Sequence, residues 1–151
     1  MIYAVLLCIA TGEKLLYFTD TFFLKWKFVG VTHIIGEVNY DSETMWEKVN
    51  DGYTPPARAK RLFQSHMSLE HFLDFLHAND LSKLKQIYIC HISSDHGNQE
   101  RIMEAVQRAT GAEVYICKEG GGVYDVSANS DRVGKTSKNK KAGEGNKMFK
   151  P

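Results

Sequence analysis

The sequence predicts one α/β domain followed by a basic tail, and three observations support this fold class. Five short runs of aliphatic, β-branched and aromatic residues have the length of buried strands. The segments between them carry apolar residues at helical spacing. Residues 86–117 combine a strand, a helix and a strand, an order typical of a parallel pair. With 151 residues and 43% hydrophobic content, the chain can form one modest core, and we expect a folded domain over residues 1–126.

The chain opens with two strand candidates, residues 2–9 and 14–19, which the intervening residues 10–13 join as a hairpin. Gly12 supplies the positive φ that such a turn needs. Asp20 follows the second strand directly. A carboxylate at that position suits a metal ligand or a catalytic group, and it suits a turn or capping residue equally well.

Residues 22–30 are aromatic and basic and predict a loop packed on the sheet, before a third strand at residues 32–38. Helices are expected near residues 43–50 and 56–63, the second opening with proline in its first turn. Ser68 is a suitable N-cap for a helix over residues 68–78, whose apolar residues recur on one face. His66 lies in the loop just before this cap.

The fourth strand, residues 86–91, ends at His91 and opens into a polar turn at residues 93–98. A histidine at the carboxyl end of an internal strand suits catalysis or metal binding, and the alternative is a core histidine hydrogen-bonded to a neighbour. A helix at residues 98–110 and a last strand at residues 113–117 follow. Glycines 120–122 predict a flexible exit rather than a phosphate loop, since no helix follows them.

Charge and cysteine content narrow the classes of function. Residues 127–151 contain seven Lys and Arg and two acidic residues, which gives them a net charge of +5. The net charge of the whole chain is +1, so residues 1–126 carry −4. We expect residues 127–151 to be disordered, and net charge gives the folded part no support for binding nucleic acid. No apolar run approaches the roughly 20 residues that cross a membrane. Three cysteines without CxxC spacing predict buried free thiols and a cytoplasmic location.

Four short segments, taken in order, resemble the C-terminal half of the metallo-β-lactamase fold, most closely in hydrolases of the tRNase Z and WalJ type from bacteria and phages. They are LLYFTDT at residues 15–21, HIIGEVNYD at 33–41, SHMSLE at 65–70 and IYICHIS at 87–93. The resemblance spans residues 2–118. It implies half of an αβ/βα sandwich, with a mixed sheet covered by helices on one face.

The resemblance also implies roles for individual residues. Asp20 resembles the aspartate that bridges two metal ions, and His91 resembles the last metal-ligating histidine. His66 resembles the histidine that donates a proton beside the scissile phosphate. Other residues expected to line the site are Glu37, Asn39 and Ser93. The implied cofactor is Zn²⁺ or Mn²⁺, dinuclear only when the missing half of the fold is present.

The metal-binding loop of the family, His-x-His-x-Asp-His, does not occur in this sequence. We therefore expect the C-terminal part of a metal-dependent hydrolase that cleaves a nucleic-acid or nucleotide phosphodiester after a second chain supplies that loop. The partner would be a complementary N-terminal half, or a second copy that associates through the exposed face of the sheet. The alternatives are a non-catalytic interaction module and a truncated gene remnant.

Overall fold

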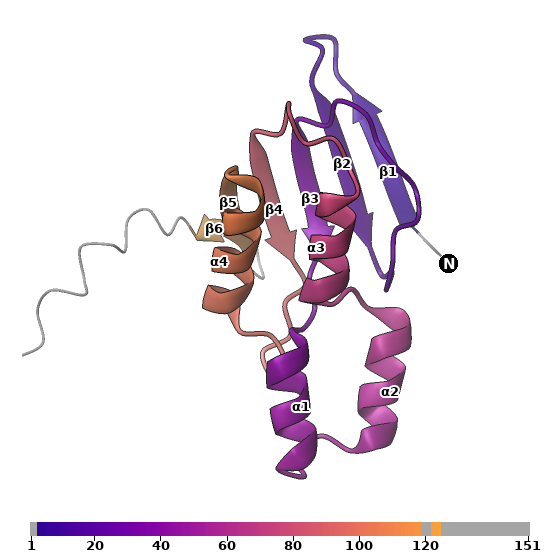
Figure 1. Ribbon diagram of the computed structural model, residues 1–151, viewed down its shortest axis with the longest axis vertical. Coiled ribbons are helices and arrows are strands. Elements are labelled where there is room, and N and C mark those ends of the chain that lie inside the picture. Colours follow the sequence, from indigo (N-terminus) through magenta and orange to yellow (C-terminus); the bar gives the residue numbers. More distant parts are fainter. Residues whose placement is uncertain (1–2, 119–121, 125–151) are drawn as a thin grey trace, which may run out of the picture.

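The computed structural model describes residues 3–118 and 122–124 of the chain. They form a six-stranded sheet and four helices (Figure 1). In chain order the elements are β1 (Tyr3–Cys8), β2 (Lys14–Thr19), β3 (His33–Glu37), α1 (Ser42–Asn50), α2 (Pro56–Ser65), α3 (Leu69–His77), β4 (Gln86–Cys90), α4 (Gln99–Thr110), β5 (Glu113–Cys117) and β6 (Val123–Tyr124). The chain is thus α/β with a mixed sheet, as predicted.

The strands lie in the sheet in the order of the sequence, β1 to β6. The hairpin partners β1 and β2 are antiparallel, whereas β2, β3, β4 and β5 all run parallel. The two-residue β6 pairs antiparallel with β5. The carboxyl ends of the four parallel strands therefore share one edge of the sheet, and the loops that follow them meet there.

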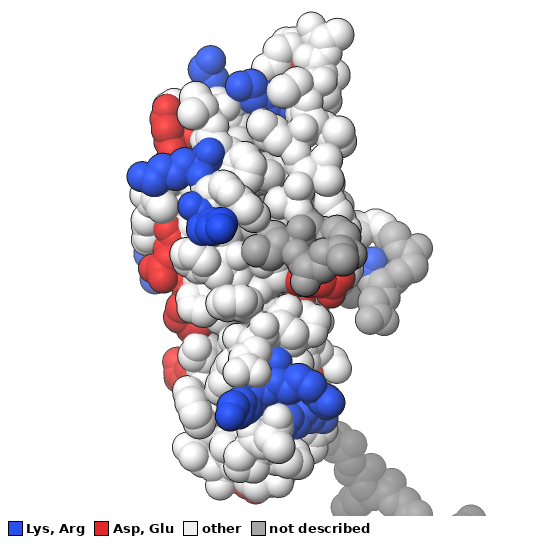
Figure 2. Space-filling view, turned by 90° about the vertical axis from the view of Figure 1, so that its right-hand side faces the viewer, with Lys and Arg blue, Asp and Glu red and all other residues white. Residues whose placement is uncertain are grey.

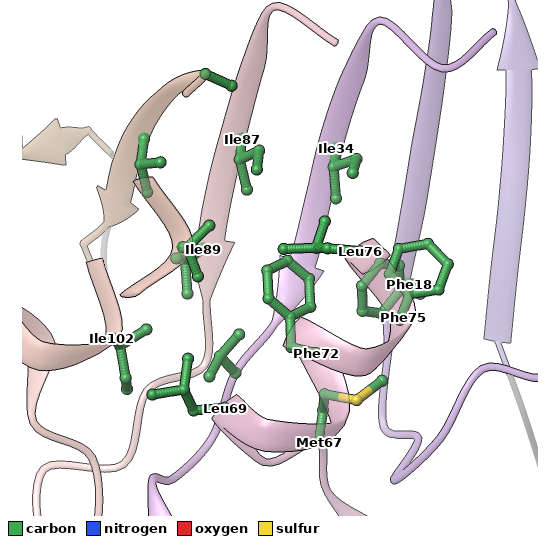
Figure 3. Packing of buried hydrophobic residues seen from close by; sticks show 14 of the residues in the cluster. Phe18, Ile34, Met67, Leu69, Phe72, Phe75, Leu76, Ile87, Ile89 and Ile102 are labelled. Atoms are coloured by element: carbon green, nitrogen blue, oxygen red, sulfur yellow. The ribbon is translucent and has the colours of Figure 1, made fainter. Parts of the chain in front are cut away.

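Helices α3 and α4 cover one face of the sheet (Figure 1). Their apolar stripes pack against alternate strand residues, such as Phe18, Ile34 and Ile89, all of which are fully buried (Figure 3). Each such side chain contributes about 1.5–3 kcal/mol when it leaves water. Gly36 lies in the same layer, and a Cβ there would come within 2.5 Å of the Phe18 ring. This close approach explains the glycine inside a strand.

Helices α1 and α2 lie beyond the carboxyl ends of the strands rather than on the sheet (Figure 1). They form a smaller core of their own around Tyr40, Met45 and Ala59. Asp41 ties this unit to the main domain. One of its oxygens caps α1 through the Thr44 N–H (2.9 Å), and the other accepts the Asn98 N–H at the start of α4 (2.9 Å).

The opposite face of the sheet carries no helix in the part of the chain that the structure describes (Figure 1). One cross-strand row runs over five strands there, and its members are Val5, Tyr17, Ile35, Tyr88 and Tyr115. Val5 and Tyr17 remain 48% and 36% exposed. We call this row the open-face row.

The predicted elements all occur, with ends shifted by at most two residues. Two expectations need correction. Strand β6 was not predicted, because Val123 and Tyr124 follow the glycine run that indicated a flexible exit. The cysteines are not fully buried as expected: Cys8 is exposed on the edge strand β1, and Cys90 and Cys117 are partly buried. The predicted disordered tail at residues 127–151 falls outside the described residues. None of the described helices has the length and apolarity needed to cross a membrane.

Candidate functional site

Three acidic and imidazole side chains meet at the carboxyl ends of β2, β3 and β4. Asp20 follows β2, Glu37 is the last residue of β3, and His91 follows β4. Each offers one ligand atom, and these atoms lie within 4.8 Å of one another. Asp20 and His91 therefore converge, as the resemblance implied, although 71 residues separate them in the sequence.

The backbone at both outer members is held in an uncommon conformation. Asp20 has a φ of 51° and His91 a φ of 56°, and they are the only non-glycine residues with positive φ in the part of the chain that the structure describes. This left-handed region costs an ordinary residue roughly 1–2 kcal/mol. Such strain concentrates at functional sites, and here it coincides with the two residues whose side chains face each other across β3.

Glu37 is fully buried and links two neighbours. Its Oε2 accepts the backbone N–H of Asp20 at 2.5 Å, and its Oε1 lies 2.5 Å from Nδ1 of His66. Burial raises the pKa of the Glu37 carboxyl, while the contacts with His66 and with the Asp20 N–H oppose that rise. Because Nδ1 of His66 is engaged by Glu37, its Nε2 is the atom left to exchange a proton with a substrate.

Residues near the ends of β2 and β3 contact His91, one at its ring and one at its carbonyl. Its Nδ1 lies 3.1 Å from Oγ1 of Thr19, the last residue of β2. When Nδ1–H donates to that hydroxyl, the lone pair of Nε2 is free for a metal ion, the usual arrangement around a ligating histidine. The Asn39 side-chain amide donates to the His91 carbonyl at 2.9 Å and so holds the loop after β4.

A cavity of about 1080 Å³ opens beside His91. Asn39, Ser93 and Arg58 are among its lining residues. The Asn39 Oδ1 is buried without a hydrogen-bond partner among the described residues. Ser93 Oγ lies 3.2 Å from Nδ1 of the buried His96. The cavity thus presents hydroxyls and the Arg58 guanidinium, which lies 3.7 Å from the Asp95 carboxylate in the same wall.

The structure brings the expected site residues into two adjoining groups. Asp20, Glu37, His66 and His91 form the first, and Asn39 and Ser93 line the cavity beside it. Thr19 and Arg58 were not anticipated. Thr19 has no signal beyond its place at the end of a strand, and Arg58 lies on a helix without sequence features of a site.

No protein-family model matches this chain, and a search of curated proteins finds no match either. The resemblance to metallo-β-lactamase hydrolases therefore rests on the sequence motifs.

The donor set suits a first-row divalent ion. Two carboxylates and an imidazole are ligands that Zn²⁺ and Mn²⁺ accept. Two ligands of one ion lie at most about 4.4 Å apart, twice the usual bond length, so a cluster spanning up to 4.8 Å needs only a small side-chain adjustment. Two or three protein ligands are too few for a dinuclear site.

Proposed function

We propose that this chain is the C-terminal part of a metal-dependent phosphodiester hydrolase of the metallo-β-lactamase superfamily. The observation that carries the proposal is the convergence of Asp20 and His91, both in strained backbone, next to the Glu37–His66 pair. A buried carboxylate that orients an imidazole is the arrangement expected of a general acid or base.

The contacts of each residue indicate its role in the proposed reaction. Asp20 and His91 would hold Zn²⁺ or Mn²⁺, which supplies an activated water and charge stabilisation when bound. Glu37 positions His66 through Nδ1 and fixes the Asp20 backbone through its N–H. His66 then presents Nε2 as the proton donor to the leaving oxygen. The cavity beside His91, with Arg58 in its wall, would receive the substrate phosphate.

A second half is part of this proposal. The open-face row would meet a complementary half that carries His-x-His-x-Asp-His and completes the metal shell. We also propose a cytoplasmic location, because Cys8, Cys90 and Cys117 are free cysteines and the cytoplasm keeps thiols reduced.

The first experiment measures Zn²⁺ binding to the full chain by isothermal titration calorimetry. We expect weak binding, because each ion lacks most of its ligands, and we expect Asp20→Ala and His91→Ala to abolish it. The matched controls are Asp74→Ala and His77→Ala on the exposed side of α3, which should bind as the unsubstituted chain does. Equal Zn²⁺ binding by the site variants and the controls would overturn the metal assignment.

The second experiment adds a separately expressed N-terminal half and follows hydrolysis of bis(4-nitrophenyl) phosphate. His66→Ala should leave Zn²⁺ binding intact and lower the rate roughly 10²- to 10⁴-fold, the usual contribution of a general acid. Glu37→Gln should lower the rate less, since it acts through His66. If the mixture binds Zn²⁺ tightly and His66→Ala cleaves at the full rate, His66 is not the proton donor.

A non-catalytic interaction module is the second candidate, and the exposed open-face row favours it. Such a module would bind its partner through that row with no need for the cluster. Partner binding that survives Asp20→Ala and His91→Ala, together with absence of hydrolysis in every mixture, would favour this function over the first.

A further inference from the structure

The loop between β2 and β3 carries a cluster of exposed aromatic and basic side chains that the proposed chemistry does not use. Phe22, Phe23 and Trp26 are 46%, 41% and 44% exposed. Lys25 and Lys27 flank Trp26, and residues 21–36 contain no Asp or Glu. The Lys25 ammonium lies 5.3 Å from the Trp26 ring centroid. We call residues 22–27 the aromatic loop.

This loop is fixed to the domain at both ends. Nδ1 of His71, on α3, lies 2.9 Å from the Phe22 carbonyl oxygen. The rings of Phe22 and Phe23 meet the His71 ring edge-on, with centroids 6.4 and 6.0 Å away. At the far end, the Phe28 N–H donates to Asn79 at 2.7 Å. The Phe22 and Phe23 rings are therefore positioned before any ligand arrives, which lowers the entropy cost of binding.

The aromatic loop begins next to the candidate metal site. Phe22 follows Asp20 by two residues, and so its backbone lies within about 7 Å of that residue. The loop then runs along the flank of the domain beside β1 and β2 (Figure 1). Seen from that flank, the surface is largely uncharged, with separate basic groups, and acidic side chains gather mainly along its left-hand margin (Figure 2).

We propose that the aromatic loop binds single-stranded nucleic acid and leads it to the site at Asp20. Exposed rings stack with bases of any sequence, and interleaved lysines pair with the phosphates. A duplex keeps its base faces stacked inside, so a single strand is the form that these rings fit. The identity of the substrate as a nucleic acid rests on the proposed function, whereas binding to the loop does not.

A membrane surface is the other ligand that aromatic and basic residues attract. The geometry favours nucleic acid. More than half of each ring's surface is covered, so the side chains lie along the domain instead of projecting from it. The loop also starts at Asp20, where a phosphodiester substrate is needed.

The test uses the full chain with Trp46→Phe, which leaves Trp26 as the one tryptophan. Titration with oligothymidine or oligouridine of about 12 nucleotides should quench Trp26 fluorescence as bases stack on it. This readout reports on the loop itself, because it follows the fluorescence of a side chain within the loop. Vesicles of phosphatidylserine and phosphatidylcholine serve as the competing ligand.

Variants quantify the contribution of each side chain by fluorescence anisotropy of the labelled oligonucleotide. In the chain that keeps Trp46, Trp26→Ala should weaken binding about 5- to 100-fold, the range for loss of one base–aromatic stack. Lys25→Ala with Lys27→Ala should lower the slope of log affinity against log salt by about 1.4, since each phosphate contact on a single strand contributes about 0.7. Lys60, an exposed lysine on α2, provides the matched control. Lys60→Ala should lower the salt slope less than the loss of either loop lysine does.

The inference is wrong if the oligonucleotide leaves Trp26 fluorescence unchanged, or if the vesicles change this fluorescence and the oligonucleotide does not. That outcome would leave the metal assignment standing if Asp20→Ala still abolishes Zn²⁺ binding. If the chain binds the oligonucleotide through the loop but does not bind Zn²⁺, the inference about the loop stands and the proposed hydrolysis is wrong.

Discussion

At the scale of single residues, strain and burial are concentrated at the carboxyl edge of the parallel strands. Asp20 and His91 adopt positive φ, and Glu37 buries a carboxyl between them. None of these choices favours folding by itself. These residues lower the free energy of unfolding locally. Such a cost is expected at positions where the residue type serves function rather than stability.

This cost predicts a difference between two substitutions of Asp20. Both Asp20→Gly and Asp20→Ala remove the carboxylate, but only glycine adopts the left-handed region without strain. We expect Asp20→Gly to be about 1 kcal/mol more stable than Asp20→Ala, measured by urea denaturation. Equal stability of the two variants would show that the backbone at Asp20 is relaxed.

His96 gives a prediction for pH. It is buried against Thr54 and Ser93, and burial, followed by the charge of Arg58, lowers its pKa below the usual 6.5. The unfolded chain then binds this proton more readily than the folded chain does, so stability is full above about pH 6.5 and falls as the pH drops toward the lowered pKa. The free energy of unfolding, measured from pH 8 to pH 5, should fall less steeply in His96→Gln. His77→Gln, at an exposed position, should keep the original slope.

At the scale of elements, one buried aspartate joins two helix N-termini. Asp41 caps α1, accepts the N–H of the residue that caps α4, and pairs with Arg101. This carboxylate, only 1% exposed, therefore links the α1 and α2 unit to α4, beside further contacts such as Ser42 with Glu70 and Thr54 with His96.

Removing that carboxylate should destabilise the protein more than loss of an ordinary cap. Asp41→Ala leaves the Thr44 and Asn98 N–H groups without their acceptor and leaves Arg101 paired with Glu43, and we expect a loss of about 2 kcal/mol. Asn98→Ala removes only the cap of α4, through the Arg101 N–H, and should cost about 1 kcal/mol. Thermal unfolding of both variants checks the order, and equal losses would contradict a linking role for Asp41.

The elements were predictable from sequence because their signals are local. Apolar periodicity with the Ser68 and Asn98 caps and Gly111 predicts α3 and α4, and the apolar run at residues 14–19 predicts β2. The stop at residues 51–52 and the prolines at 55–56 predict the end of α1 and the start of α2. The contacts between residues of the site were harder to predict from the sequence. The contact of Glu37 with His66 spans 29 positions and depends on which face of β3 turns inward. The resemblance supplied both residues, but only the register of the sheet shows that they touch.

At the scale of the whole molecule, the sheet has one covered and one open face. The open-face row presents apolar and aromatic side chains from β1 to β5. Neither its pairing nor its extent is visible in the sequence, since it depends on five strands lying in register. Exposed apolar surface of this kind marks interaction sites.

We expect this face to drive association. Size-exclusion chromatography with light scattering should show self-association, or a complex once a complementary half is added. Tyr17→Lys should reduce it, because a charge then stands in the middle of the row. Lys60→Ala, away from the face, should not. A monodisperse monomer that never binds a partner through this face would contradict the expectation.

The separate core of α1 and α2 has a kinetic consequence. A unit with its own small core can open without global unfolding once contacts such as Ser42 with Glu70 and Thr54 with His96 are released. Amide hydrogen exchange should then show α1 and α2 exchanging together, ahead of α3 and the central strands. Because His66 ends α2 and its N–H bonds to Leu62, each opening would withdraw the imidazole from Glu37. The rate of this opening would then limit how long the proton donor stays in place.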